Sequence, residues 1–193
     1  LGERTWIGLS TDFNGATTKY TYENDNLTVV ENSDGSKTLY EYDDLHRVTK
    51  ETDANGNVTK YEYNGAYLSA TTNANGGVNK YYYNKLGKIV SIENPLGQVT
   101  RFVYDGAGRT IQQQSPDGAI TKFEFDAAGN TKSITDANGN KISFEYDANG
   151  NVVKSTNPVG NVTSYTYDGL NNVLTEKDAS GNVTSYTYDC FSN

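Results

Sequence analysis

The chain has 193 residues, among them 16 tyrosines, 19 glycines and no methionine, and only 35% of its residues are apolar. These proportions exclude a large aliphatic core and favour a thin sheet, in which Tyr rings are buried while their hydroxyls stay near water. The net charge of -8, with Lys and Arg scattered along the chain, argues against a nucleic-acid partner, because phosphate binding depends on clustered cations. No apolar run approaches the roughly 18 residues of a membrane span. Cys190 is the single cysteine, so neither an internal disulfide nor a cysteine zinc site can form.

The first twelve residues, 1–12, fit the pattern of the rest poorly, and we expect them to form an irregular or degenerate first repeat. Residues 1–10 lack the basic start and apolar middle of a signal peptide. Because the chain opens in mid-pattern and stops just after a Tyr-Asp pair, we expect it to be an excised or processed piece of a longer protein.

After residue 12 the sequence repeats itself every 20 or 21 residues as far as the C-terminus. One aromatic residue keeps this spacing at Tyr22, Tyr42, Tyr63, Tyr83, Tyr104, Phe125, Tyr146, Tyr167 and Tyr188. A second aromatic row precedes the first by two positions and includes Tyr61, Tyr81 and Tyr165. Glycines keep the same spacing at Gly15, Gly35, Gly56, Gly76, Gly97, Gly118, Gly139, Gly160 and Gly181. Chance does not hold such a register, so we predict that residues 1–193 form a single array of about nine units.

Each repeat is predicted to contain two short strands. In Asn57–Tyr63, the side chains of Thr59, Tyr61 and Tyr63 alternate with Val, Lys and Glu, which is typical of a strand with one aromatic face. A second strand follows, as in Lys88–Ile92. The chain is therefore predicted to be all-β, with tandem hairpins of about 21 residues forming a continuous antiparallel β-strip.

Two turns of the pattern Asp/Asn-x-x-Gly join these strands. The Asp side chain can cap such a turn, and Gly can adopt the positive φ that a tight hairpin needs. Where the fourth-position Gly is missing, we expect Asn26 and Asn171 to adopt the left-handed conformation, for which His46 and Ser192 are poorer substitutes. Asn64–Ala66 shortens one turn. Three prolines suit the position after Asp/Asn or Ser in the second turn: Pro95, Pro116 and Pro158.

The motif Tyr-Asp-x-x-Gly-Arg is complete at Tyr104–Arg109 and ends in Lys or Asn at Tyr83–Lys88 and Tyr146–Asn151. Repeated in this way, it resembles the signature of Rhs or YD repeats, a family that includes bacterial Rhs and wall-associated proteins, the BC shells of Tc toxins, and teneurins. The resemblance implies that the β-strip coils into a spiral, a hollow barrel or a shell. Most units have Asn where the family has Arg, and no core segment with a self-cleaving Asp can be located.

Catalytic and metal chemistry find little support in the sequence. Asp136–Asn140 lacks the sixth-position glycine and the terminal Glu of a calcium loop, so ordinary turn capping is the favoured interpretation. His46, the one histidine, lies seven repeats from Cys190 and has no nucleophile pattern beside it. Asp and Glu recur in every unit, so no unit stands out as a glycosidase site. We therefore expect no enzymatic activity, no cofactor and no metal.

The aromatic rows have two interpretations. We favour a packed or lumen-facing side that holds neighbouring strands together, because aliphatic residues are few. The alternative is an exposed ladder that stacks on sugar rings, with Tyr61, Tyr81 and Tyr165 as candidate residues.

These observations favour a structural segment of a secreted or cell-surface protein that builds a shell or a fibre by lateral strand stacking. Isolated hairpins are marginal in water, and Tyr186–Tyr188 is expected to leave an open strand edge, so the partners would be adjacent repeats of a longer chain or further copies. The alternatives are a carbohydrate-binding adhesin surface and part of a toxin-encapsulating Rhs shell.

Overall fold

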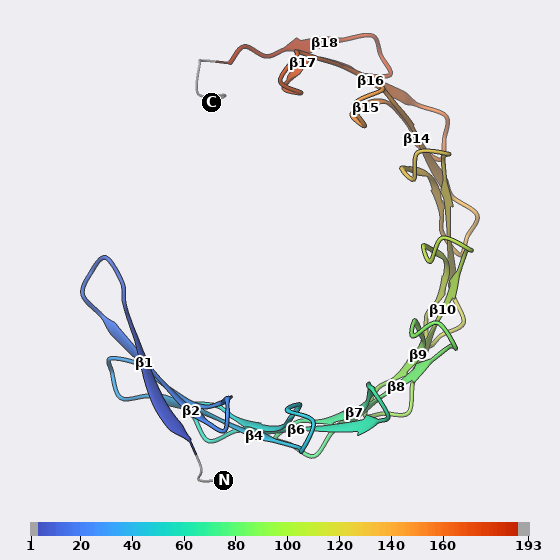
Figure 1. The fold of residues 1–193 in the computed structure, drawn as a ribbon. Coiled ribbons are helices and arrows are strands. Elements are labelled where there is room, and N and C mark those ends of the chain that lie inside the picture. Colours follow the sequence, from blue (N-terminus) through green and yellow to red (C-terminus); the bar gives the residue numbers. More distant parts are fainter. Residues whose placement is uncertain (1–3, 189–193) are drawn as a thin grey trace. The chain divides into compact units, whose positions relative to one another are not determined.

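The computed structural model describes residues 4–188 and consists of antiparallel β-strands, with no helix among these residues. This confirms the all-β prediction. The chain divides into two units, residues 1–99 and residues 100–193, which are described separately. Figure 1 shows the strands coloured along the sequence.

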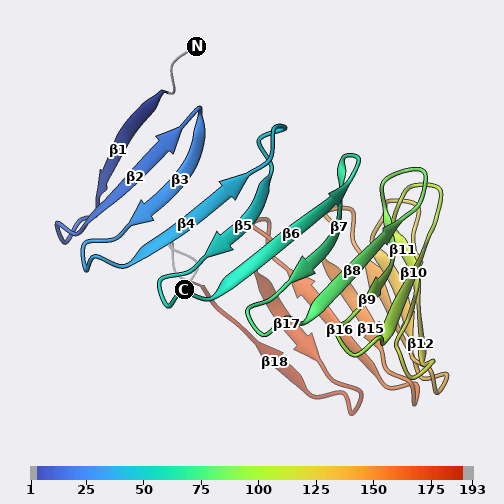
Figure 2. The same cartoon turned by 90° about the horizontal axis from the view of Figure 1, so that it is seen from below.

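The first unit contains the strands from β1 to β9, each paired antiparallel with the next along the chain. Figure 2 shows these strands side by side in chain order, joined by tight turns. Their bounds are β1 (Thr5–Thr11), β2 (Thr17–Glu23), β3 (Asn26–Glu31), β4 (Lys37–Tyr42), β5 (Val48–Thr52), β6 (Val58–Asn64), β7 (Tyr67–Thr72), β8 (Val78–Tyr83) and β9 (Ile89–Glu93).

The second unit continues the same pattern, with successive strands from β10 to β18 paired antiparallel. β10 begins at the boundary between the units. The bounds are β10 (Val99–Tyr104), β11 (Thr110–Gln114), β12 (Ile120–Phe125), β13 (Thr131–Thr135), β14 (Lys141–Tyr146), β15 (Val152–Thr156), β16 (Val162–Tyr167), β17 (Val173–Lys177) and β18 (Val183–Ser185).

The even-numbered strands from β2 to β16 carry the two aromatic rows, and in several of them exposed and half-buried side chains alternate as the sequence predicts. In β6, Tyr61 and Tyr63 are half-buried while Lys60 and Glu62 are exposed. Because successive side chains of a strand point to opposite faces, one face of each unit carries the two aromatic rows and the other carries mainly polar residues.

Neither unit has a conventional core. Among the described residues only Ala70, at 7% exposure, and Ser133, at 0%, are buried, and the other side chains are half-buried or exposed. A sheet of this kind is stabilised by contacts between neighbouring strands, which makes the residues that join one hairpin to the next important for its stability.

A β-bulge recurs in every hairpin that begins with an aromatic strand, from β2–β3 to β16–β17. In β4–β5, Glu41 pairs with Lys50 and Tyr42 pairs with Val48, so Thr49 is the additional residue. Such a bulge bends the strand and increases its local twist. Sequence reasoning did not predict it.

Two turns have only two residues between their strands, the turn after β2 and the turn after β6. After β2, Asn24 and Asp25 adopt φ of 50° and 68°, and Asn26 is the first residue of β3, so the prediction that Asn26 adopts the left-handed conformation is wrong. A two-residue turn with φ > 0 at both positions fits the twist of the strands there better than a longer loop. Asn171 has φ of 66°, which confirms the prediction that it adopts the left-handed conformation, and His46 adopts the same conformation at φ 59°. Ser192 lies outside the described residues.

The last strand is shorter than the sequence predicts. β18 ends at Ser185, so Tyr186–Tyr188 do not form the strand edge that we expected. Tyr186 N still donates a hydrogen bond to Leu174 O at 2.9 Å, which continues the ladder by one contact.

Candidate functional site: the contacts between neighbouring hairpins

The Asp-x-x-Gly turns share one geometry. In Asp105–Arg109, Gly108 N donates to Asp105 O at 3.0 Å and Asp105 N donates to Arg109 O at 3.0 Å. The Asp105 carboxylate accepts hydrogen bonds from the backbone of Ala107 and Arg109 at 2.9 and 3.0 Å. These bonds, first that from the Arg109 backbone, lower the pKa of Asp105. Gly108 has φ of 80°, which Gly adopts without the steric cost of a Cβ.

The glycines and prolines of the sequence pattern lie in such turns. The turn glycines named from the sequence have φ between 75° and 90°: Gly15, Gly35, Gly56, Gly76, Gly97, Gly118, Gly139, Gly160 and Gly181. Pro95, Pro116 and Pro158 each follow the first residue of a turn closed by a backbone hydrogen bond, in Asn94–Gly97, Ser115–Gly118 and Asn157–Gly160, as predicted.

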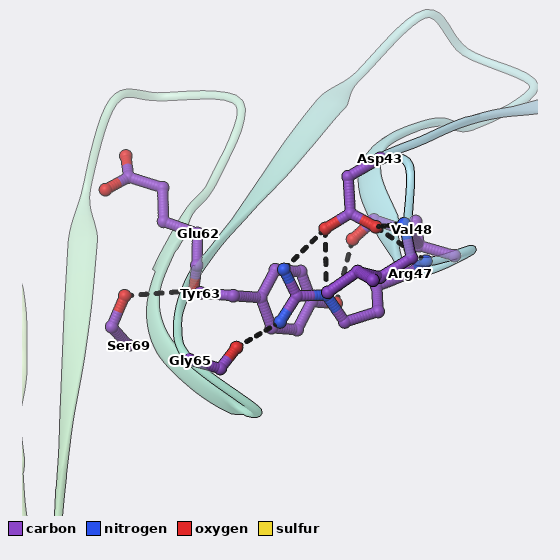
Figure 3. A network of polar contacts seen from close by, with 8 residues as sticks. Asp43, Arg47, Val48, Glu62, Tyr63, Gly65 and Ser69 are labelled. Carbon is purple, nitrogen blue, oxygen red and sulfur yellow. Dashed lines mark hydrogen bonds and ion pairs between the residues drawn. The ribbon is translucent and has the colours of Figure 1, made fainter.

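An arginine after the turn reaches the next hairpin. Arg47 Nε donates to Asp43 Oδ2 at 2.8 Å, and its guanidinium lies 4.1 Å from the centre of the Tyr63 ring (Figure 3). Arg47 also donates to the Gly65 carbonyl, so one side chain joins its own turn to the following hairpin. Its side-chain bond to Asp43 is the main cause that lowers the pKa of this carboxyl. Arg109 makes the corresponding turn and ring contacts, with Nε 2.7 Å from Asp105 Oδ2 and its guanidinium 4.6 Å from the Phe125 ring.

The last tyrosine of a repeat makes a second contact to the preceding hairpin. Tyr63 Oη donates to Val48 O at 2.8 Å, which links β6 to β5 (Figure 3). The same bond, over the same 15 residues, joins Tyr42 to Leu27, Tyr146 to Thr131 and Tyr167 to Val152, at 2.7–2.8 Å. Burial of the ring raises the pKa of Tyr42, Tyr146 and Tyr167. We call the turn residue over the ring, together with the tyrosine hydroxyl bond, the inter-hairpin clasp.

The repeated unit matches a known family. A model described as RHS Repeat matches residues 23–58, 42–78, 83–120, 125–161 and 146–182, which together are more than half of the chain. The chain belongs to the RHS repeat family. This confirms the resemblance that the Tyr-Asp-x-x-Gly motifs indicate. None of the curated proteins compared with the chain matches it.

Solved structures share the fold of these RHS repeats at low identity. A structure titled TcdB2-TccC3-Cdc42 is 15% identical with a TM-score of 0.62, and the match covers 97% of this chain and 14% of that one. The Tc holotoxin pore of Photorhabdus luminescens, with a mutated TccC3, is 15% identical with a TM-score of 0.61, over 97% of this chain and 13% of that one. The RHS array thus spans only a small part of the length of the chains it resembles.

Three RHS repeats of this chain have asparagine in place of the arginine of the clasp, at Asn130, Asn151 and Asn172. Asn151 Nδ2 donates to Asp147 Oδ2 at 3.0 Å, so asparagine keeps the bond within the turn. It also donates to Asn171 Oδ1, on the next turn, at 2.8 Å. An amide is shorter than a guanidinium, and it joins neighbouring turns by a hydrogen bond instead of a cation over a ring.

The tyrosines considered for sugar stacking are half-buried in their strands. Tyr61 Oη bonds Glu51 Oε2 at 3.0 Å, and Tyr81 Oη lies 3.2 Å from Thr71 Oγ1. These two hydroxyls contact the neighbouring strand, which supports a packing role. Tyr61 and Tyr81 lie in the first unit and Tyr165 lies in the second.

Other chemistry considered from the sequence finds no assembled site in residues 4–188. No group of three or more His, Cys, Asp or Glu in this range could hold a metal ion. His46 Nδ1 lies 2.8 Å from Asn26 Oδ1, and Cys190 is outside the described part of the chain. No helix in that part is long and apolar enough to span a membrane.

Proposed function

We propose that this chain is a structural segment of a longer RHS protein, in which hairpins pair side by side to build the wall of a shell. The inter-hairpin clasp carries this proposal. Its contacts bind neighbouring hairpins to one another at several junctions, while the units have almost no buried residues of their own. A repeat that is stabilised chiefly by its neighbours suits an extended wall better than an independent globular domain.

The partners would be adjacent repeats of the same longer protein. The chain spans 14% of the length of a solved chain that shares its fold, which supports a place inside a larger assembly. The resemblance to Rhs proteins also supports secretion or display at the cell surface, and enclosure of a toxin, for the longer protein. A structural wall requires no catalytic group, so we expect no enzymatic activity.

Electron microscopy of the full-length protein tests the shell. We expect hollow particles whose walls are one sheet thick. Long fibres formed by the purified chain would favour lateral association into a polymer instead. Solid particles in which this segment packs against other domains on both faces would overturn the proposal.

A further inference from the structure

Tyr67 brings a second phenol ring into contact with an aromatic row. Its ring stacks on that of Tyr83, with centroids 4.9 Å apart and planes 23° apart. This separation lies within the range of stacked aromatic pairs, whose ring carbons are in van der Waals contact. Tyr67 lies in β7 and Tyr83 lies in β8, so the contact joins neighbouring hairpins.

A two-residue turn and a glycine hold Tyr67 in this position. Asn64 pairs with Tyr67 across the turn, which makes Tyr67 the first residue of β7. A Cβ at Gly87 would lie 2.7 Å from Tyr67 Oη, closer than such atoms approach, so glycine at this position admits the phenol. The Tyr67 ring therefore lies against the backbone of the next turn as well as against Tyr83.

The register separates the tyrosines that belong to the aromatic rows. Tyr63 and Tyr83 lie two strands apart, which is about 9–10 Å, and Tyr81 and Tyr83 lie about 7 Å apart along one strand. Trp6 stacks on Tyr22 at the corresponding place of an earlier repeat, but that contact pairs an indole with a phenol. Tyr67 and Tyr83 thus have the geometry that a bond between two phenols requires.

Exposure decides whether an oxidant can reach this pair. Tyr67 is 45% exposed and Tyr83 is half-buried. Tyr82 is also 45% exposed, but it points to the opposite face of β8 from Tyr83, and its hydroxyl donates to Glu93 Oε2 at 3.3 Å. Tyr67 and Tyr82 are therefore equally open to solvent and differ in their contact with Tyr83.

We propose that Tyr67 and Tyr83 form a site of oxidative cross-linking, at which a carbon–carbon bond joins the two rings ortho to their hydroxyls. The oxidant is hydrogen peroxide acting through a haem peroxidase, which removes one electron and one proton from each phenol. The two phenoxyl radicals couple through the ortho carbons. The hydrogen on each joined carbon then moves to the oxygen of its own ring, which restores both phenols, and the peroxide leaves as two molecules of water.

The bond closes a loop between β7 and β8 and ties two neighbouring hairpins together. A disulfide cannot do this within the chain, because Cys190 is its single cysteine. Such a cross-link stabilises a fold as a disulfide does, by restricting the unfolded chain, and thiols do not break it. This modification goes beyond the proposed wall and does not depend on it.

The test exposes the whole chain to hydrogen peroxide and a haem peroxidase, followed by trypsin and mass spectrometry. Tryptic peptides 61–80 and 81–85 contain the two tyrosines. We expect these peptides to be joined, with a mass lower than their sum by two hydrogens, and fragmentation to assign the bond to Tyr67 and Tyr83. The yield should not change when the protein is diluted, because the bond forms within one molecule.

Two matched variants test the assignment. Tyr67→Phe keeps the ring but forms no phenoxyl radical, so the joined peptides should be lost. Tyr82→Phe removes an equally exposed hydroxyl beside Tyr83 and should leave their yield unchanged. Circular dichroism would verify that both variants fold; if Tyr67→Phe does not, Tyr83→Phe replaces it, because Phe125 occupies this position in another repeat.

Four results would overturn the proposal. These are joined peptides that persist in Tyr67→Phe, their loss in Tyr82→Phe, a yield that falls on dilution, and the absence of any bond between the two peptides.

Discussion

At the scale of single residues, the clasp explains why the motif Tyr-Asp-x-x-Gly-Arg keeps these residue types. The guanidinium of Arg47 satisfies Asp43 through Nε and still covers the Tyr63 ring, which an ammonium group cannot do with the same geometry. The Tyr63 hydroxyl then bonds a carbonyl of the preceding hairpin. Each residue thus stabilises the junction between two hairpins.

Replacing the clasp arginine tests this role. Arg47→Lys should lower the free energy of unfolding by about 1 kcal/mol, because the cation over the ring and the planar bond to Asp43 are both weakened. Urea denaturation measures the loss. Arg101→Lys, at an exposed position of β10, is the control and should change little. An equal effect of the two substitutions would contradict the clasp.

The contribution of the tyrosine hydroxyl to stability can be tested by removing the hydroxyl in one repeat and adding it in another. Tyr63→Phe should cost about 1 kcal/mol, because the Val48 carbonyl loses a donor. Phe125 is the natural counterpart without a hydroxyl, and Phe125→Tyr should regain up to about 1 kcal/mol by reaching Thr110, 15 residues earlier. Thermal unfolding of both variants checks the pair, and the hypothesis fails if their melting temperatures shift in the same direction.

At the scale of elements, the strands and most turns could be predicted from the sequence, because their signals are local. Alternation locates β6, and Asp-x-x-Gly locates the loop at Asp105–Gly108. The bulge at Thr49 could not be predicted, since it depends on pairing across two strands. The stacking of Tyr67 on Tyr83 was missed for a related reason, because it depends on contact between two neighbouring hairpins.

The turn conformation predicts that two substitutions change the free energy of unfolding in opposite directions. Gly56 has φ of 82°, and a Cβ at this position would meet no atom within 4 Å, so Gly56→Ala should cost about 1–2 kcal/mol through backbone strain alone. Gly106 has no positive φ, and a Cβ there would also meet no atom within 4 Å, so Gly106→Ala should stabilise by about 0.4–1 kcal/mol by restricting the unfolded chain. Chemical denaturation of the two variants would show the opposite shifts; a destabilised Gly106→Ala would contradict this account.

At the scale of the whole molecule, the same titrating groups recur in turn after turn, so their effects accumulate. The pKa values of several turn carboxyls lie below the ordinary 3.8, chiefly because side chains such as those of Arg47 and Asn57 or, at Asp105, the Arg109 backbone donate to them. The group comprises Asp34, Asp43, Asp53, Asp105, Asp136, Asp147, Asp168 and Asp178. The pKa of the Tyr42 and Tyr146 hydroxyls shifts the other way, because burial raises it above 10.0.

Stability should therefore fall at both ends of the pH scale. A lowered carboxyl pKa contributes stability that is present above about pH 4 and is lost as the pH falls through the folded-state values. A raised tyrosine pKa contributes stability that is present below about pH 10 and is lost as the pH rises through the folded-state values. The melting temperature between pH 2 and pH 12 measures both. A constant melting temperature down to pH 2 would contradict the role of the turn carboxylates.

The two short turns also affect how such an array can change in length. Both 20-residue intervals between last aromatics, Tyr22 to Tyr42 and Tyr63 to Tyr83, contain a two-residue turn, and both keep the bulge. A missing residue is thus absorbed at the hairpin tip, and the aromatic side chains stay on their face. Insertions and deletions of one residue are tolerable at these tips, whereas the same change within a strand would exchange the two faces. Repeats of unequal length can therefore be joined in one array.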